Sequence, residues 1–239
     1  MIALSMDMEW ATPQVIRDSL DLLSEYSVSA TLFSTHDDGF DVEPHERALH
    51  PNFMGEDAEP ESVIAELSDY YPDALGTRSH AMYTYSGLRS LYGDHGLVYE
   101  SNYMMYGVDG IRPFEMTRDV VQLPVYFMDD TWLRRSGESE AIPDPASLLS
   151  GPGLKVFDFH PPHVAFNTPS ISYYEEHKDA YWDESTDLRE LRSADPGVRD
   201  LFVRLLEHVA DHDVETRLLC DIARDVRNNP LDAAPDRPV

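Results

Sequence analysis

The chain opens with an alternation of strand and helix that restricts what it can fold into. An apolar strand over 2–9 is followed by Thr12-Pro13, which is typical of a helix start with threonine as N-cap and proline in the first turn. Apolar residues then recur at helical spacing to about Tyr26, and a second strand follows at 28–35. A strand, a helix and a strand in this order favour parallel pairing with a right-handed crossover.

The same alternation continues along the chain. Further strands are expected at 46–49, 75–80, 97–100, 120–127, 154–160 and 215–219. Further helices are expected at 61–70, 86–92, 144–149 and from a cap at Asp195 to about His212, with excursions at 55–60 and 169–195. About seven strands alternating with helices predict an α/β fold, either a barrel or an open doubly wound sheet.

The length is that of one such unit. A chain of 239 residues lies in the range of roughly 200 to 250 residues that barrel-like α/β folds use as one domain. We therefore expect a single domain over 1–227. The segment 228–239 carries a Pro-Asp pattern and is expected to be a flexible tail.

The charge is strongly acidic. Eighteen basic against 45 acidic residues give a net charge of -27, which argues against nucleic acid as a partner. Hydrophobic residues make up 42% of the chain, enough to fold, so the acids must coat the outside. A folded protein that tolerates such self-repulsion indicates a salt-rich cytoplasm, and we expect a halophilic host, an archaeon.

One cysteine, Cys220, excludes an internal disulfide, and its neighbours Leu218 and Leu219 indicate that it is buried. The sequence shows neither a basic and apolar signal peptide nor an apolar run of membrane length. We therefore expect a cytoplasmic protein without a membrane partner. The sequence leaves the oligomeric state open.

Polar residues gather where the expected strands end. Asp7 and Glu9 close the first strand, and because side chains at i and i+2 share a face, both would enter the same space. His50, His80 and His160 each lie at or just after a strand end. In parallel α/β folds this rim of the sheet binds ligands, so these five residues predict a metal-hydrolase site.

Four stretches of the chain resemble a known family. They are Asp7-Met8-Glu9 with Trp10-Ala11, His50-Pro51-Asn52-Phe53, Arg78-Ser79-His80, and Phe157-Asp158-Phe159-His160-Pro161. In this order they resemble the motifs of polysaccharide deacetylases with NodB homology, also called carbohydrate esterase family 4. The resemblance covers most of the chain and implies a distorted (β/α) barrel with about seven parallel strands.

The resemblance implies a divalent metal held by Glu9 and His50, with zinc first and cobalt, nickel, manganese or iron as alternatives. Two departures stand out. Glu9 replaces the family's usual aspartate. Met54 stands where a second ligand histidine is expected, and its thioether cannot serve as a ligand for a hard divalent ion. His80, at a neighbouring strand end, is the replacement candidate.

The resemblance also implies catalytic roles for three residues. Asp7 would be the general base, and Arg78 would keep it ionised, since an opposite charge favours the charged form. His160 would protonate the departing amine. A bound metal would acidify water and polarise an amide carbonyl. Together these roles predict a hydrolase that removes an N-acetyl group from an acetamido sugar or a glycan precursor.

Two other functions stay open. The substitutions at Glu9 and Met54 also fit a sugar-binding protein without catalysis on a degenerated deacetylase fold. The same site could serve an amidohydrolase that cleaves the C–N bond of a small amide. The expected partner is accordingly a carbohydrate or a small amide.

Each site residue has a structural alternative. Asp7 and Glu9 could cap the following helix, His50 could be an ordinary loop residue before proline, and His80 could be a hydrogen-bonded core residue. Arg78 could pair with loop carboxylates, in which case Arg112 competes for its role.

Several further motifs are ambiguous. His36-Asp37-Asp38-Gly39 resembles an Asp-Asp-Gly motif, but it closes the second strand and is expected to be unrelated to the site. His163 and Asn167 could bind a sugar or brace their loop, and bracing is favoured. A final group of aromatic residues could line a sugar groove or pack on the rim, namely Tyr83, Tyr85, Tyr103 and Tyr106.

Overall fold

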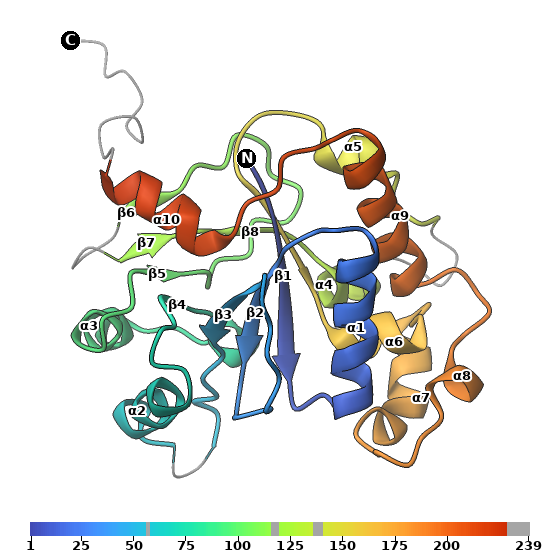
Figure 1. The fold of residues 1–239 in the computed structure, drawn as a ribbon, viewed down its shortest axis with the longest axis horizontal. Helices are drawn as coiled ribbons and strands as arrows, with labels where there is room; N and C mark the ends of the chain where they lie inside the picture. The colour runs from blue at the N-terminus through green and yellow to red at the C-terminus, as the bar shows by residue number, and fades with distance from the viewer. Residues whose placement is uncertain (56–57, 116–119, 136–140, 229–239) are drawn as a thin grey trace.

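A mostly parallel sheet forms the centre of the molecule, with helices packed around it (Figure 1). Figure 1 is a computed structural model that describes residues 1–55, 58–115, 120–135 and 141–228. The strands are β1 (Ile2–Glu9), β2 (Thr31–Ser34), β3 (Glu46–Leu49), β4 (Gly76–Thr77), β5 (Tyr99–Glu100), β6 (Phe114–Glu115), β7 (Val121–Gln122), β8 (Val125–Met128) and β9 (Lys155–Phe159). The longer helices are α1 (Pro13–Glu25), α2 (Pro60–Tyr70), α3 (Ser86–Asp94), α7 (Ile171–Tyr181), α9 (Val198–Asp211) and α10 (Leu219–Asn228). The shorter ones are η1 (His80–Met82), α4 (Asp129–Arg135), α5 (Pro145–Leu149), α6 (Pro161–Phe166) and α8 (Leu188–Leu191).

The strand order is β6-β7-β5-β4-β3-β2-β1-β9-β8, and only β6 with β7 is antiparallel among the described pairs. β1 lies between β2 and β9, with Ser5 opposite Thr31 on one side and Asp158 on the other. A strand flanked on both sides within a parallel sheet is buried on both faces. This explains why the first strand reads as a nearly continuous apolar run.

The sheet is curled into a barrel-like shape. β7 and β8 stand near opposite ends of the strand order, yet only Leu123 and Pro124 separate them in the chain. The segment after β5 runs beside β8, where Met104 forms a bridge with Val125. The expectation of a single strand over 120–127 is therefore wrong, because Pro124 has no amide hydrogen to continue the ladder and the chain changes partners there. The expected α/β fold of the barrel type is confirmed, and the described residues form nine strands rather than the expected seven or so.

Helix packing follows the expected amphipathic pattern. α1 begins after Thr12, with Pro13 in its first turn, and buries Val15, Ile16, Leu22 and Leu23. α6 packs against both α1 and α9, and the Phe159 ring of β9 lies 4.7 Å from the Phe202 ring of α9. Cys220 is buried as expected.

Two expectations at the C-terminal end are wrong. Residues 215–219 form a single bridge, Thr216 with Ile2, rather than a strand. α10 begins at once, because the buried acceptors Thr31 and Glu46 take the free amides of its first two residues. Asp195 does not cap α9. Its N-cap is Gly197, whose amide donates to Asp200, and a side chain at Gly197 would collide with the backbone of Asn167.

The expected excursion over 169–195 contains two helices. α7 begins where the Ser170 side chain accepts from the Tyr173 amide, and α8 where Asp187 accepts from the Arg189 amide. Among the described residues of α7 only Tyr181 is buried. The helix therefore needs no apolar stripe, and the sequence gives no periodic pattern that would predict it. α10 extends to Asn228, so that residue is not part of a tail, and 229–239 lie outside the described residues.

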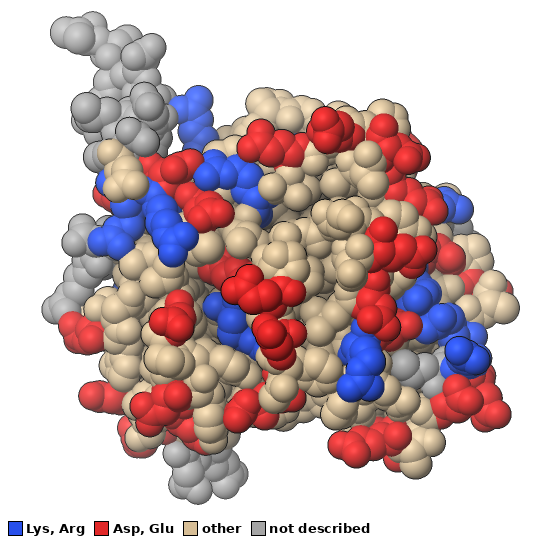
Figure 2. All heavy atoms as spheres, viewed as in Figure 1, with Lys and Arg blue, Asp and Glu red and all other residues tan. Residues whose placement is uncertain are grey.

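Acidic side chains cover much of the face in Figure 2, with arginine and lysine in smaller groups. This agrees with the expectation that the acids coat the exterior. Within the part of the chain that the structure describes, no helix is both long enough and apolar enough to cross a membrane.

Candidate active site

β1 delivers two carboxylates to the carboxyl end of the sheet. Asp7 pairs with Phe33 and Glu9 with Ser34, so the register shifts between them by one extra residue. The backbone of Glu9 then adopts a φ of 45°, in the left-handed region that residues other than glycine rarely occupy. Both carboxylates line one cavity. Strained backbone of this kind is typical of functional sites.

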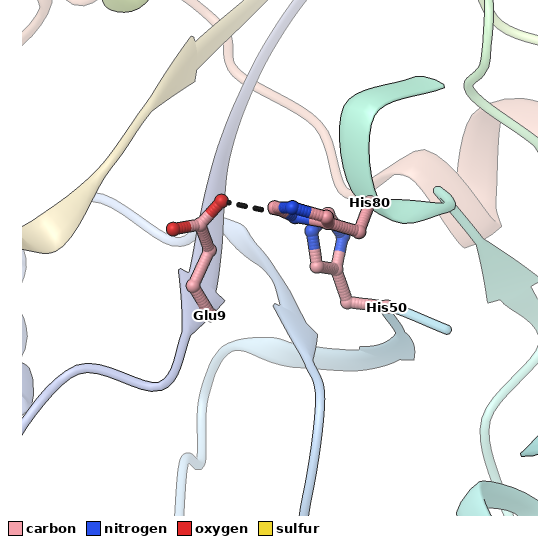
Figure 3. Close-up of side chains that lie close together, drawn as sticks. All are labelled: Glu9, His50 and His80. Carbon is pink, nitrogen blue, oxygen red and sulfur yellow. Dashed lines mark ion pairs between the residues drawn. The ribbon is translucent and has the colours of Figure 1, made fainter. Parts of the chain in front are cut away.

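Glu9, His50 and His80 form a group with metal-ligand geometry (Figure 3). One potential ligand atom from each lies within 4.8 Å of the others. His50 follows β3, and its amide donates to Ser34 of β2 at 2.8 Å. His80 opens the turn η1 instead of ending a strand, so the expected strand 75–80 is shorter. Figure 3 shows the His80 ring pointing toward the Glu9 carboxylate, with the His50 ring next to that of His80.

The ring nitrogens of this group fit a metal ion. Among the described residues, neither His50 nitrogen has a hydrogen-bond partner, although that side chain is 1% exposed. Burial lowers the pKa of His50, which favours the neutral imidazole that binds metals. His80 Nδ1 lies 3.2 Å from Glu9 Oε1 without hydrogen-bond geometry. Buried nitrogens without partners are costly unless a ligand satisfies them.

A second group, Asp7, Asp158 and His160, also brings potential ligand atoms within 4.8 Å of one another. A guanidinium already occupies it. Arg78 donates through Nη1 to Oδ1 of both aspartates, at 2.7 Å to Asp7. A metal cation there would face a fixed positive charge, so the group with two histidines is the better metal site.

Arg78 is buried and every nitrogen of its guanidinium is used. Nε and Nη2 donate to Ser101, Nη2 also donates to Ser5, and the guanidinium carbon Cζ lies 4.2 Å from the Phe33 ring centre. Burial alone would raise the pKa of Asp7, but Arg78, with help from His50, lowers it by more, so its net pKa is below the ordinary value. Asp7 is therefore an ionised, oriented carboxylate.

Asp158 differs from Asp7 although both share Arg78. Burial raises its pKa to about 8; Arg78 opposes this and the charge of Asp7 adds to it. Its Oδ1 accepts from Ser5 at 2.8 Å, while Oδ2 has no partner among the described residues. One arginine thus faces one ionised carboxylate and one that holds its proton near neutral pH.

His160 lies at the N-cap of α6, where Asp129 fixes its ring. Its Nδ1 is 2.6 Å from Asp129 Oδ1, and its Nε2 is 3.9 Å from Glu9 Oε1. Burial alone would lower the pKa of His160, but Asp129 and then Glu9 raise it by more, so the net pKa is well above 6.5. This imidazole is protonated at neutral pH, with Nε2 toward the carboxylates.

These groups open onto a cavity of about 420 Å³. Asp7, Glu9, His80 and His160 are in its wall. The remaining wall residues are Ala81, Met82, Met104, Met128, Asp130, Thr131, Arg134, His163 and Tyr174. The cavity has the size of a small-ligand site, and it joins carboxylates, imidazoles and apolar side chains.

The structure brings all six expected site residues together. Asp7, Glu9, His50, Arg78, His80 and His160 come from the ends of four strands or the turns after them. Their catalytic and metal-binding roles stay predictions. Two supporting residues were not expected: Asp129 opens α4, which the sequence pattern did not predict, and Asp158 was only part of a motif. An acid two residues before His160 on a strand was the available signal for Asp158.

The structure also shows the contacts of the residues whose motifs were ambiguous. Asp38 pairs with Arg47 and so braces the turn after β2, and neither residue is in the wall of the cavity. Arg112 is exposed. Asn167 ends α6 and donates to Asp200 and two carbonyls, so bracing is its observed contact pattern. His163 lies 3.2 Å from the Thr168 hydroxyl and also lines the cavity.

The curled parallel sheet, with carboxylates and imidazoles at its carboxyl end, defines a protein of the polysaccharide deacetylase type. A family model described as WbmS-like polysaccharide deacetylase matches residues 4–178, and the chain belongs to this family. No protein among those with curated functions matches the chain.

The solved structures that are similar to this chain include the following two. One is a candidate polysaccharide deacetylase from Bordetella bronchiseptica, described as involved in O-antigen biosynthesis; it is 28% identical with a TM-score of 0.78, over 87% of this chain and 90% of that one. The other is a candidate polysaccharide deacetylase from Mycobacterium smegmatis, 17% identical with a TM-score of 0.55, over 100% of this chain and 94% of that one. The second likeness concerns the fold alone.

Proposed function

We propose that this protein is a metal-dependent hydrolase that removes the acetyl group from an acetamido sugar of a glycan precursor. One observation carries the proposal. Potential ligand atoms of Glu9, His50 and His80 lie within 4.8 Å of one another, and Asp7 and His160 line the same cavity as Glu9 and His80. A metal-ligand group between an ionised carboxylate and a protonated imidazole supports amide hydrolysis.

The metal group would consist of two imidazole nitrogens and one carboxylate. This donor set is typical of catalytic zinc sites, in which three protein ligands leave a position open. Cobalt, nickel, manganese and iron accept similar donors. When bound, the ion would supply a Lewis acid for the acetamide carbonyl and would acidify a water molecule.

Asp7 is proposed to act as the general base. Its Oδ1 is held by Arg78 at 2.7 Å, which fixes the carboxylate in the cavity wall while keeping it ionised. The proton of the attacking water passes to this carboxylate. Arg78 is a positioning residue, because it acts through Asp7 and does not line the cavity.

His160 is proposed to act as the general acid. Asp129 holds Nδ1, so the proton available to a substrate is on Nε2. The leaving amine takes this proton as the C–N bond breaks. Base and acid thus begin in the protonation states that the reaction requires.

The substrate class is supported by family membership and by the O-antigen association of the Bordetella protein. Together with the cytoplasmic location proposed for this chain, that association favours a biosynthetic precursor over a finished external polymer. A small amide is the competing substrate for the same chemistry.

The test is acetate release from N-acetylated sugars by protein supplied with zinc, cobalt, nickel or manganese. We expect activity in the wild type and losses of roughly 10²- to 10⁴-fold in Asp7→Asn and His160→Ala. Arg112→Ala is the matched control, since this exposed arginine belongs to the competing motif. Equal activity in all four proteins, or hydrolysis of small amides alone, would contradict the proposal.

A further inference from the structure

The cavity wall differs in charge between the elements that form it. β1 contributes the carboxylates of Asp7 and Glu9. α4 contributes Arg134, and α6 contributes His163 next to the protonated His160 at its N-cap. Arg134 is the only arginine or lysine among the wall residues, in a chain with 18 basic and 45 acidic residues. The proposed reaction uses neither Arg134 nor His163.

The His163 ring is held by a chain of buried hydroxyl groups. Its Nδ1 lies 3.2 Å from the Thr168 hydroxyl, which lies 2.6 Å from the Tyr181 hydroxyl. Burial raises the pKa of Tyr181, and its hydroxyl has no other hydrogen-bond partner among the described residues. A buried hydroxyl with one partner donates to it, so Tyr181 donates to Thr168. Thr168 then donates to His163, and Nδ1 is the acceptor.

A His163 ring that accepts at Nδ1 carries its hydrogen on Nε2. Burial lowers the pKa of His163 by more than Asp129 raises it, so the imidazole is neutral and has one N–H group. Nε2 has no partner among the described residues yet is not enclosed by protein, so it opens onto the cavity that His163 lines. His163 is only 6% exposed, and a nearly buried donor without an acceptor is costly.

Arg134 uses one edge of its guanidinium and leaves the other free. Its Nε donates to both carboxylate oxygens of Asp130, at 3.1 and 3.0 Å. Nη1 and Nη2 have no hydrogen-bond partner among the described residues, and the side chain is 59% exposed. A charged fork of N–H groups is therefore open to a ligand in the cavity that His163 also lines.

An ordinary surface ion pair explains only part of this arrangement. Asp130 and Arg134 are four residues apart on α4, and such pairs are common and contribute little to stability. The pair does not explain the free donor on His163. Tyr174 of α7 lies next to both groups, because its ring is 5.0 Å from that of His163 and, after Asp130, it helps to raise the pKa of Arg134. The two donors thus belong to one surface.

We propose that Arg134 and His163 bind an anionic substituent of the sugar being deacetylated, a carboxylate or a phosphate. The two Nη groups of an arginine match a pair of anionic oxygens, and the Nε2–H of His163 supplies a further donor. The acetamide then lies toward β1 and η1, and the anionic group toward α4 and α6. This inference rests on the proposed function and narrows its substrate class from acetamido sugars in general to acidic ones.

Binding of the amino sugars that the reaction would release tests the site without catalysis, because these sugars have no acetyl group to lose. Glucosamine is compared with glucosaminuronic acid, which has a carboxylate at C6, and with glucosamine 1-phosphate, by titration calorimetry in 0.1 M KCl. We expect at least one acidic sugar to bind roughly tenfold or more tightly than glucosamine, because charge-assisted hydrogen bonds are the stronger kind. The acid that gains identifies the anionic group. Equal binding of all three sugars would overturn the proposal.

Two arginine variants separate a local site from the overall charge. Arg134→Gln and Arg135→Gln each remove one positive charge from the last turn of α4, but Arg135 is not in the cavity wall and lies over the Tyr106 ring. Arg134→Gln should lower the preference for the acidic sugar roughly tenfold, whereas Arg135→Gln should keep it. An equal change in both variants would overturn the proposal.

Two histidine variants test the second donor. His163→Phe keeps a ring and removes the Nε2–H, whereas His163→Gln retains an N–H donor near the same position. His163→Phe should weaken binding of the acidic sugar roughly three- to tenfold, and His163→Gln should recover part of the loss. The Tm of each variant shows whether it is folded. Binding that is unchanged in folded His163→Phe, or lost equally in both variants, would overturn the role of His163.

The two proposals can fail separately. Binding of an acidic amino sugar that depends on Arg134, with no acetate release from N-acetylated sugars under any metal, would leave the anion site standing and remove the proposed reaction. Acetate release with equal kcat/KM from neutral and acidic N-acetylated sugars would do the reverse.

Discussion

The Asp129 carboxylate holds His160 at two points. Its Oδ1 lies 2.6 Å from the His160 ring Nδ1, and its Oδ2 accepts the His160 backbone amide at 2.8 Å. Asp129 is fully buried at the start of α4, directly after β8, and β8 pairs with the strand that precedes His160. The charge and the orientation of the imidazole therefore depend on a neighbouring strand.

Asp129→Asn should move the alkaline limit of activity to lower pH. Asp129 raises the pKa of His160, so its loss lowers that pKa, and a general acid loses its proton as pH rises through it. We expect kcat to fall roughly 10- to 100-fold at pH 8 and less at pH 6. A full pH profile of kcat for both proteins measures this, and an alkaline limb at the wild-type position would contradict the role of Asp129.

Replacing Arg78 should destabilise the protein as well as inactivate it. Arg78→Met leaves the ionised Asp7 carboxylate buried without its cation and removes a hydrogen-bond donor from Asp158, and breaking a buried ion pair from one side costs about 3–5 kcal/mol. Denaturant unfolding measures the loss. Arg47→Met, which breaks the partly buried pair with Asp38, is the control and should cost less. An equal loss in both variants would argue against a special role for Arg78.

Asp158→Asn should gain stability relative to the wild type as pH rises. A carboxyl with a pKa of about 8 keeps its proton in the folded state while the unfolded chain has lost it above pH 4. The unfolding free energy of the wild type therefore falls as pH rises from about 4 to 8. The variant has no carboxyl at this position, so its unfolding free energy lacks this contribution. Unfolding free energies of both proteins at pH 5 and pH 8 test it. A difference that does not grow with pH would show that Asp158 is ionised throughout.

Salt should stabilise the fold. A net charge of -27 repels itself at low ionic strength, and salt shortens the range of that repulsion. We expect the Tm to rise by more than about 5 °C between 0.1 and 2 M KCl, which is about 1 to 3 kcal/mol at this size. Sucrose at equal osmolality serves as the control. A Tm that falls or stays level in KCl would contradict the prediction of a salt-rich cytoplasm.

The parts of the fold that the sequence predicted are those with strong local signals. The start of α1 has threonine and proline at its first positions, and β1 is an apolar run ended by two acids. α7 was missed because Tyr181 is the one buried residue among its described positions, so no apolar stripe repeats along it. α4 buries Trp132 and Leu133, but it spans only Asp129–Arg135, which is too short for a periodic pattern to stand out. The strand expected at 215–219 failed because Thr31 and Glu46, distant in sequence, cap a helix there.

The site was predictable to the extent that it lies at strand ends. Asp7 and His160 follow this rule directly. His80 was inferred as a replacement ligand, but the turn that contains it could not be predicted. Ala81 and Met82 in this turn both have positive φ, which their residue types do not indicate. Asp129 could not be inferred, because its role depends on the pairing of β8 with β9.

Metal titration tests the central claim most directly. Wild-type protein is stripped with a chelator, zinc is added in steps, and acetate release from an N-acetylated sugar is followed together with bound metal. His50→Ala, which lacks a proposed ligand, is measured in parallel. The account predicts no activity without metal, a linear rise that ends at one bound ion per chain, and neither tight binding nor activity in His50→Ala. Full activity after stripping, or an unchanged titration in His50→Ala, would contradict it.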